Sequence, residues 1–399
     1  MTSVLGSLNI FTIMAKKSKE NYPAKIKVVG VGGAGGNAVT RMADSFPRSI
    51  DLIVVNTDIQ DLEHAQARKK IHIGKSLTRG LGTGMNPEIG QQAAEEDRAE
   101  IAEALKGADM VFIAAGFGGG TGTGATPIVA EIAKELGILT IAVVTKPFGF
   151  EGSKRAQIAQ DGIARVKEKV DTLIAIPNDK IFSIINKETS LIKAFEAIDE
   201  VLKNAVLGIT ELIISPGIVN VDFADVKAIM NDAGSSVIGI GRASGKDRAT
   251  VAATQAINSP LLEMSIDGAK GVLFGISGQR DLKMSEINEA ANLISENIDP
   301  AAKIIFGAYH DRRLNKGQLK ITLIATGFNG NYGGGNNDML SQGLFSPRIT
   351  VKEEIFEEPV TNGSLFEESE KSAKKSKKEK EEESEDVLDM PAFLRKRRK

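Results

Sequence analysis

The sequence predicts an α/β protein whose first domain is a parallel sheet, and three observations indicate this fold class. Near-continuously apolar segments alternate with segments in which apolar residues recur at helical spacing. This alternation is typical of a parallel sheet covered by helices on both faces. Two glycine-rich stretches, 30–36 and 118–124, each follow an apolar strand and precede a helical pattern. At 399 residues, the chain is also long enough for two compact domains with extensions.

The first domain is expected to span residues 24–188. Its strands are predicted at 25–29, 50–55, 110–115, 138–144 and 172–176, and its helices after the first glycine stretch to Met42, at 127–136, at 88–106 and at 151–168. A connector, 189–216, follows. It is predicted to hold one long helix over 189–213, because six apolar residues from Leu191 to Ile209 recur at helical spacing.

The second domain, residues 217–329, is predicted to be a smaller α/β unit. Its helices are expected at 222–232, 246–257 and 285–296, and its strands at 235–241, 270–277, 302–308 and 319–326. The long helix is the natural link between the two domains, so the fold class has a parallel-sheet domain, a central helix and a smaller C-terminal domain.

Both ends of the chain are expected to lie outside these domains. Residues 1–23 are predicted to be a flexible extension, and the pattern allows translation to start at Met1 or at Met14. Residues 330–385 are rich in Gly, Asn, Glu, Lys and Ser, which bury too little apolar surface to offset chain entropy. We expect a disordered linker there. Residues 386–399 contain an apolar cluster, which is typical of a peptide that docks in a partner's groove.

Composition excludes several classes of function. The net charge of −2 argues against a general nucleic-acid binder. The chain has no cysteine, which excludes disulfides and zinc–thiolate sites, and its three histidines are scattered. No stretch reaches the roughly 18 apolar residues of a membrane span, and the N-terminus lacks the basic region of a signal peptide. We therefore expect a cytoplasmic protein without a transmembrane segment.

The glycine stretch 118–124 has the composition of a phosphate-binding loop. Glycine permits close backbone approach, and the helix that follows adds the positive end of its dipole, so the backbone N–H groups can hold an anion. A mobile glycine linker is the alternative, but such linkers rarely lie between a buried strand and a helix.

The first glycine stretch matches G-x-G-x-x-G at Gly30, Gly32 and Gly35. By itself this motif supports a dinucleotide site, with Asp51 or Asp58 as imperfectly spaced partners for a ribose. An NAD-dependent oxidoreductase that uses Gly30–Gly35 is therefore one hypothesis. The second glycine loop favours the other, because two loops can surround a nucleoside di- or triphosphate.

Two further groups of polar residues have ordinary as well as functional interpretations. Asp222 and Asp225 lie on one face of a predicted helix start, where capping alone would explain an Asp; together with Asn220, they could instead polarise water. Glu151 and Arg155, four residues apart, could form a surface ion pair or contact a sugar or phosphate.

Seven motifs, in order along the chain, resemble those of the tubulin/FtsZ superfamily, which includes the cell-division GTPases of bacteria. They are Gly30–Asn37, Asn56–Asp58, Thr78–Gly82, Gly118–Gly124, Val144–Phe148, Ile176–Lys180 and Asn220–Asp225. The resemblance covers about 25–328 and resumes at Asp389–Arg395. It implies a GTP-binding domain, a long core helix and a smaller GTPase-activating domain.

The resemblance also implies a GTP site, and Mg²⁺ is the default companion of a nucleoside triphosphate. The residues that would contact GTP are Gly33, Ala34, Gly35, Gly36, Asn37, Gly120, Thr121, Gly122, Glu151, Arg155, Asn178 and Asp199. Position 34 departs from the glycine-rich pattern, and its methyl group is tolerable if φ is negative.

In the superfamily, the residues that match Asn220, Asp222 and Asp225 act in trans, in the nucleotide site of the next subunit. Such a head-to-tail contact propagates into a filament. The resemblance therefore implies that the chain's partner is itself and that its filaments form the cytokinetic ring at the midcell division site. The tail Asp389–Arg395 resembles the peptide that binds membrane-anchoring division proteins such as FtsA.

Overall fold

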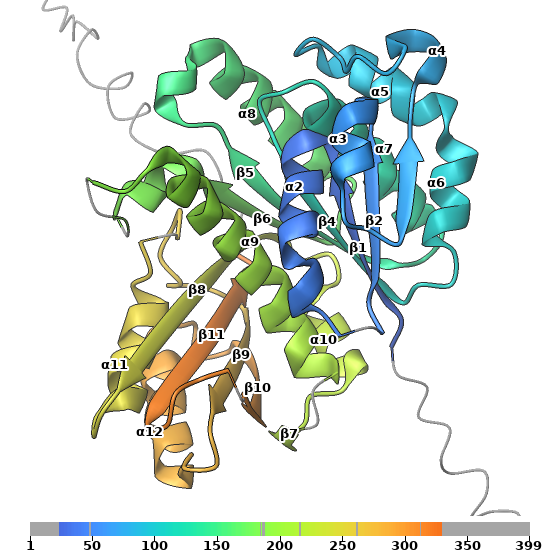
Figure 1. Cartoon of the computed structure of the whole chain (residues 1–399). Helices are drawn as coiled ribbons and strands as arrows, with labels where there is room; N and C mark the ends of the chain where they lie inside the picture. Colours follow the sequence, from blue (N-terminus) through green and yellow to red (C-terminus); the bar gives the residue numbers. More distant parts are fainter. Residues whose placement is uncertain are drawn as a thin grey trace, which may run out of the picture. The chain divides into compact units, whose positions relative to one another are not determined.

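One sheet runs through the protein, with the strand order β3-β2-β1-β4-β5-β6-β8-β11-β9-β10-β7 (Figure 1). The structure is a computed structural model, and it describes residues 24–328 apart from 48, 184, 186–187, 215–216, 261 and 312. The predictions for the N-terminal extension, the linker and the C-terminal peptide lie outside these described residues.

The first half of the sheet is fully parallel, as predicted. Its strands are β1 (Ile26–Val31), β2 (Asp51–Asn56), β3 (Lys69–His72), β4 (Met110–Gly116), β5 (Leu139–Lys146) and β6 (Thr172–Pro177). Its helices are α2 (Gly32–Met42), α3 (Ile59–His64), α4 (Lys75–Thr78), α5 (Pro87–Glu96), α6 (Arg98–Leu105), α7 (Thr121–Glu135) and α8 (Ser153–Lys167). Three short 3₁₀ turns complete it: η1 (Ala43–Ser45), η2 (Gly149–Glu151) and η3 (Asn178–Ser183).

Helices cover both faces of this half. Alternate residues of each strand join two different cores: Val28 packs with α2 and the long helix, whereas Val29 packs with α5, α6, α7 and α8. Buried side chains of this kind each contribute about 1.5–3 kcal/mol when removed from water. The double coverage explains why the strands are apolar along their whole length.

The single helix predicted at 88–106 is wrong, because α5 and α6 are separate helices. The break falls at Asp97, whose φ and ψ of −106° and 23° are not helical. The Oδ2 atom of Asp97 accepts a hydrogen bond from the backbone N–H of Gly74 at 2.7 Å. A contact between residues far apart in the sequence is made at this break, and the local pattern gives no sign of it.

The long helix is confirmed as α9 (Leu191–Ile214). Its buried side chains, from Ile198 to Leu212, share one core with strands of the first half and with Ile238, Leu273 and Ile324 of the second half. The two halves therefore pack against the same long helix. None of the helices in the described part of the chain has the length and apolar character of a membrane span.

The second half of the sheet is mixed. Its elements are β7 (Gly217–Val219), α10 (Phe223–Met230), β8 (Gly234–Ser244), α11 (Arg248–Ile257), β9 (Gly271–Gly278), α12 (Met284–Glu296), β10 (Lys303–His310) and β11 (Gln318–Thr326). The start of β8 pairs with β6 in parallel, and the rest pairs with β11, so β8 joins the two halves (Figure 1). The short elements α3, α4, β3 and β7 were not predicted.

A buried ion pair ties α11 to α12. The guanidinium of Arg248 donates to Glu286 at 2.7 Å and to Asp281 at 2.9 Å, and both Arg248 and Glu286 are buried. The hydrogen bond from Arg248 outweighs the effect of burial and lowers the pKa of Glu286. Because the pKa of Glu286 is lower in the folded state, its carboxylate stabilises the fold at pH values above 4.5, the ordinary pKa of Glu. This stabilisation is lost as the pH falls through the folded-state pKa.

Glu286→Gln should lower the free energy of unfolding by about 3 kcal/mol at neutral pH, because Arg248 loses a buried charged partner. Urea denaturation at pH 7 and near pH 4 would measure the effect, which should shrink at the lower pH. Glu103→Gln is the control, since its pair with Lys106 is exposed. An equal effect of Glu286→Gln at both pH values would contradict the prediction.

Candidate functional site

Two helices begin side by side at the carboxyl ends of the neighbouring strands β1 and β4. The first turns of α2 hold Gly33, Ala34, Gly35, Gly36 and Asn37, and α7 begins with Gly120, Thr121 and Gly122. Neither helix has a side-chain N-cap or an acidic residue in its first turn. The free N–H groups and the two dipoles therefore favour an anion at this edge of the sheet.

Glycine is required where the two loops meet. A Cβ atom on Gly32 would lie 2.8 Å from the backbone N of Gly122, and one on Gly35 would lie 2.2 Å from the carbonyl O of Ala114. These distances are shorter than real Cβ contacts. The starts of α2 and α7 thus approach each other closely enough to enclose one ligand. Ala34 lies within α2 and is not among the residues with positive φ, so its methyl group is tolerated as expected.

Threonine hydroxyls converge beside these loops. The Oγ1 atom of Thr121 lies 2.7 Å from that of Thr57, which follows β2, and 3.4 Å from that of Thr83. All three residues are buried. Sequence reasoning identified Thr121 but missed Thr57 and Thr83 as neighbours, because the three residues converge only in the folded chain.

Glu151 and Arg155 border the same site from the carboxyl end of β5. Glu151 Oε2 lies 2.5 Å from Arg155 Nη1, and its Oε1 accepts a hydrogen bond from the N–H of Phe148. The Nη2 atom of Arg155 reaches the sulfur of Met85 at 3.9 Å. The expected ion pair forms, and it lies next to Gly118, whose added Cβ would be 3.0 Å from the Arg155 carbonyl.

Asn178 follows β6 at the same edge of the sheet. Its side chain is buried, and its Oδ1 has no hydrogen-bond partner within the described residues. Buried polar atoms are nearly always paired, so an orphaned oxygen here indicates a place for a donor from a ligand.

An aromatic group completes this end of the site, and sequence reasoning missed it. Phe148 packs edge-on against Phe195 of α9, with ring centroids 5.9 Å apart, and against Phe182 at 5.4 Å. Phe195 is 42% exposed, so one part of its ring is free for a ligand. Asp199 lies one helical turn further along α9 and forms an ion pair with Arg41 of α2. Phe195 and Asp199 are four residues apart, so the sequence could have indicated that they lie on the same face of the helix.

The structure does not bring Asn220, Asp222 and Asp225 to this site. Asp222 is the N-cap of α10 and accepts a hydrogen bond from the N–H of Asp225 at 2.9 Å, so the capping interpretation holds for Asp222. Asn220 Oδ1 accepts from the N–H of Gly217 at 2.7 Å. Figure 1 shows α10 and β7 beyond the C-terminal end of α2, away from the start of this helix.

A hydrogen bond explains where α10 lies. The hydroxyl of Thr172, at the amino end of β6, donates to the carbonyl of Met230 at the end of α10. The glycine loops follow the carboxyl ends of the strands. The glycine loops and the end of α10 therefore lie at opposite ends of the parallel strands.

The residues proposed for a dinucleotide ribose are engaged elsewhere. Asp51, at the amino end of β2, forms an ion pair with Arg68. Asp58 caps α3 and accepts hydrogen bonds from the N–H groups of Gln60 and Asp61. The oxidoreductase hypothesis therefore gains no support from either residue. The described residues also contain no cluster of three or more His, Cys, Asp or Glu side chains suited to a metal ion.

The sequence and the fold match one family over most of the described chain. Residues 25–186 match the Tubulin/FtsZ family, GTPase domain, and residues 234–329 match the FtsZ family, C-terminal domain. The solved structure of an empty FtsZ dimer from M. jannaschii is 47% identical, with a TM-score of 0.73, and the match covers 81% of this chain and 92% of that one.

The chain belongs to the tubulin/FtsZ family. It has the tubulin/FtsZ fold, and the family's GTPase domain makes it a GTPase that binds GTP. Two Haloferax volcanii structures share the fold at lower identity. They are a GDP-bound CetZ1 monomer, with 22% identity, 77% and 95% coverage and a TM-score of 0.67, and a GTPγS-bound CetZ2 protofilament, with 23% identity, 75% and 92% coverage and a TM-score of 0.65.

Gly35→Ala should reduce GTP affinity at least about ten-fold, equivalent to about 1.4 kcal/mol, because the added methyl group forces the start of α2 away from β4. Binding of a fluorescent GTP analogue would measure the loss. Ala34→Gly, in the same turn but exposed, should change affinity far less. Similar losses in the two variants would contradict the steric argument.

Proposed function

We propose that this GTPase assembles head to tail into filaments that form the cytokinetic ring, and that each active site is completed by the next subunit. The observation that most supports this proposal is that one chain holds two separate groups of candidate active-site residues. We call these groups the nucleotide half-site and the carboxylate half-site. Backbone donors and hydroxyls gather at the carboxyl ends of the strands of the first half, whereas α10, which Asp222 caps and which holds Asp225, ends beside the amino end of β6. A second copy stacked on the first brings the two half-sites together.

In this proposal, the phosphates of GTP lie on the two helix starts. Gly33 to Asn37 and Gly120 to Gly122 offer backbone N–H groups, and Thr121 adds a hydroxyl. Glu151 and Arg155 face the ribose and the phosphates from the end of β5. The subunit that binds GTP holds the phosphates, and the carboxylates of the next subunit act on the attacking water.

The guanine base would lie against the aromatic group. Phe195 offers a partly exposed ring for stacking, which is worth about 1–3 kcal/mol per base. Asp199 accepts hydrogen bonds from the N1–H and 2-amino groups of guanine, and Asn178 pairs its orphaned oxygen with the ligand. Because Asp199 is ion-paired with Arg41 in the free protein, GTP binding requires this pair to rearrange.

Asp222 and Asp225 of the next subunit would polarise the attacking water. Stacking that joins one edge of a subunit to the opposite edge of another is heterologous, so it continues into a filament without closing. The related structures include an FtsZ dimer and a CetZ2 protofilament, which supports self-association of this chain.

Mg²⁺ fits this site only as an ion held mainly by phosphates and water. The described residues offer hydroxyls there and no cluster of three carboxylates, and Mg²⁺ commonly keeps several waters and takes few protein ligands. Thr121 and Thr57 would orient those waters. When bound, the ion neutralises charge on the phosphates.

The proposal also covers where the filaments lie in the cell and what anchors them. We place the filaments in the cytoplasm at midcell, under the membrane, on the basis of the family. Asp389–Arg395 would bind a membrane-anchoring division protein such as FtsA; this peptide lies outside the described residues. No observation favours a second function.

The GTPase rate per subunit should rise steeply with protein concentration, because the site is complete only between copies. Asp222→Ala and Asp225→Ala should each retain GTP affinity and lose turnover by about 100-fold or more. Phosphate release and nucleotide binding would be measured over a range of protein concentrations. A rate independent of concentration, or normal turnover in both variants, would rule out the shared site.

Asp199→Ala should weaken GTP binding by about ten-fold or more, since a charged hydrogen bond to the base contributes about 1.5–3 kcal/mol. Competition between GTP and ATP would show whether base selectivity falls as well. Glu196→Ala, an exposed neighbour on α9, is the control. Unchanged affinity and selectivity in Asp199→Ala would place the base elsewhere.

A further inference from the structure

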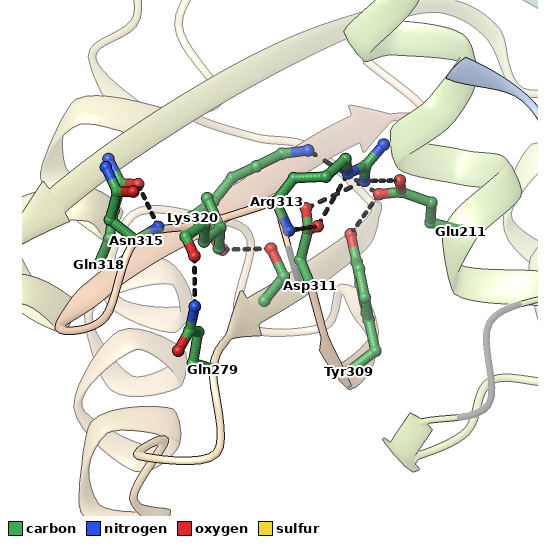
Figure 2. Close-up of polar contacts among 10 residues, drawn as sticks. Glu211, Gln279, Tyr309, Asp311, Arg313, Asn315, Gln318 and Lys320 are labelled. Carbon is green, nitrogen blue, oxygen red and sulfur yellow. Dashed lines mark hydrogen bonds and ion pairs between the residues drawn. The ribbon is translucent and has the colours of Figure 1, made fainter. Parts of the chain in front are cut away.

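A cluster of charged and hydroxyl side chains, all buried except Arg313, joins α9 to the second half of the sheet (Figure 2). Glu211 of α9 is buried, and the hydroxyl of Tyr309 in β10 donates to its Oε2 at 3.0 Å. Arg313 also donates to this carboxylate, and Lys320 Nζ lies 3.8 Å from Oε2. One carboxylate of the central helix is therefore held by three groups from the C-terminal half.

The groups around Glu211 are themselves fixed. Asp311 binds Arg313 through two contacts, from Nε to Oδ1 at 2.8 Å and from Nη2 to Oδ2 at 3.0 Å. Burial opposes ionisation of Asp311, but the hydrogen bonds from Arg313 outweigh it and hold its pKa below the ordinary value. Burial and the charge of Glu211 raise the pKa of Tyr309 well above 10, so its hydroxyl stays protonated and remains a donor.

Tyr309 also pairs with β7. β10 pairs with β7 at only two positions, Ala308 with Val219 and Tyr309 with Gly217, and the register shifts between them. Residue 220, where the loop with the carboxylates begins, follows β7 directly. The residue whose hydroxyl donates to α9 is thus also one of the two residues that pair with this short strand.

The loop beyond β7 is anchored to the same two elements. The buried side chain of Val221 lies over Gly307 of β10, where an added Cβ would be 3.1 Å from Val221 Cγ2. The Cδ2 atom of Leu212, the residue after Glu211, would lie 2.8 Å from that Cβ. Side chains of α9 and of the loop therefore meet at one glycine of β10, and Val221 stands between Asn220 and Asp222.

We propose that Glu211 and Tyr309 are positioning residues for the loop that carries Asn220, Asp222 and Asp225. Their contact fixes β10 on α9, and β10 in turn fixes β7 and the loop. The inference rests on the proposed function, in which this loop serves the neighbouring subunit. A subunit without the contact would bind GTP and assemble, but it would present misplaced carboxylates to its neighbour.

Tyr309→Phe and Glu211→Gln test the inference with little change in shape. Each variant should bind GTP within about two-fold of the wild type, since neither residue lies at the nucleotide half-site. Turnover in assembled protein should fall about ten-fold or more, because small displacements of catalytic groups are costly. Thermal unfolding verifies that the variants are folded. If one of them does not fold, the other is sufficient for the test.

Mixing with a second variant separates positioning from general damage. Asp199→Ala is expected to bind GTP weakly and to keep an intact carboxylate loop. At low GTP its own site is therefore empty, and it can only supply its carboxylates to the GTP-loaded site of a neighbouring copy. Added to Tyr309→Phe, it should raise GTPase activity several-fold, because the loaded sites then receive correctly placed carboxylates. A defect in folding or in the nucleotide half-site of Tyr309→Phe would not be rescued in this way.

Two controls make the outcomes distinguishable. Glu286→Gln removes a buried carboxylate of the same half-sheet that does not contact β7 or α9, and its turnover should be unchanged. Asp222→Ala in the same mixture reports on the proposed function: if Asp199→Ala does not rescue it, the shared site is wrong. Rescue of Asp222→Ala would support the shared site. In that case, two results would overturn the positioning role: normal turnover in Tyr309→Phe, or a loss of turnover in Tyr309→Phe that Asp199→Ala does not rescue.

Discussion

The direction of two neighbouring parallel strands is the constraint on which the rest of the structure depends. β1 and β4 end at the same edge of the sheet, so α2 and α7 begin there together. Their first turns carry neither caps nor acidic residues, and the N–H groups remain available to an anion. Gly35 and Gly122 then allow the backbones to meet. The phosphate site is thus a product of topology before any side chain contributes chemistry.

The same topology supports the proposal that each active site is shared between two copies. A parallel strand has its binding loop at one end and the elements that precede it at the other, and α10 packs at the amino end of β6. α9 connects the two regions. With Asp199 and Glu211 twelve residues apart, the rod places one carboxylate near the nucleotide half-site and another, about 18 Å further along, near the loop that follows β7.

Most of the architecture could be predicted from the sequence, because buried strands and the long helix leave periodic apolar patterns. The failures have a common cause in contacts between distant residues. Asp97 ends α5 while its side chain binds Gly74, and β7 exists only because β10 pairs with it. In the candidate site, the glycine stretches predicted where α2 and α7 begin. The convergence of Thr57 on Thr121 and the exposure of Phe195 depended on the folded chain.

The separation of the half-sites has a consequence for the ends of an assembly. In the filament that we propose, every internal contact would pair the glycine loops of one copy with the carboxylates of the next. The first copy exposes its carboxylates to solvent, and the last exposes its loaded glycine loops with no Asp222 above them. That last nucleotide is therefore spared hydrolysis until another copy arrives. Each proposed filament would therefore carry one unhydrolysed GTP at this end, and every added copy would replace it with a new one.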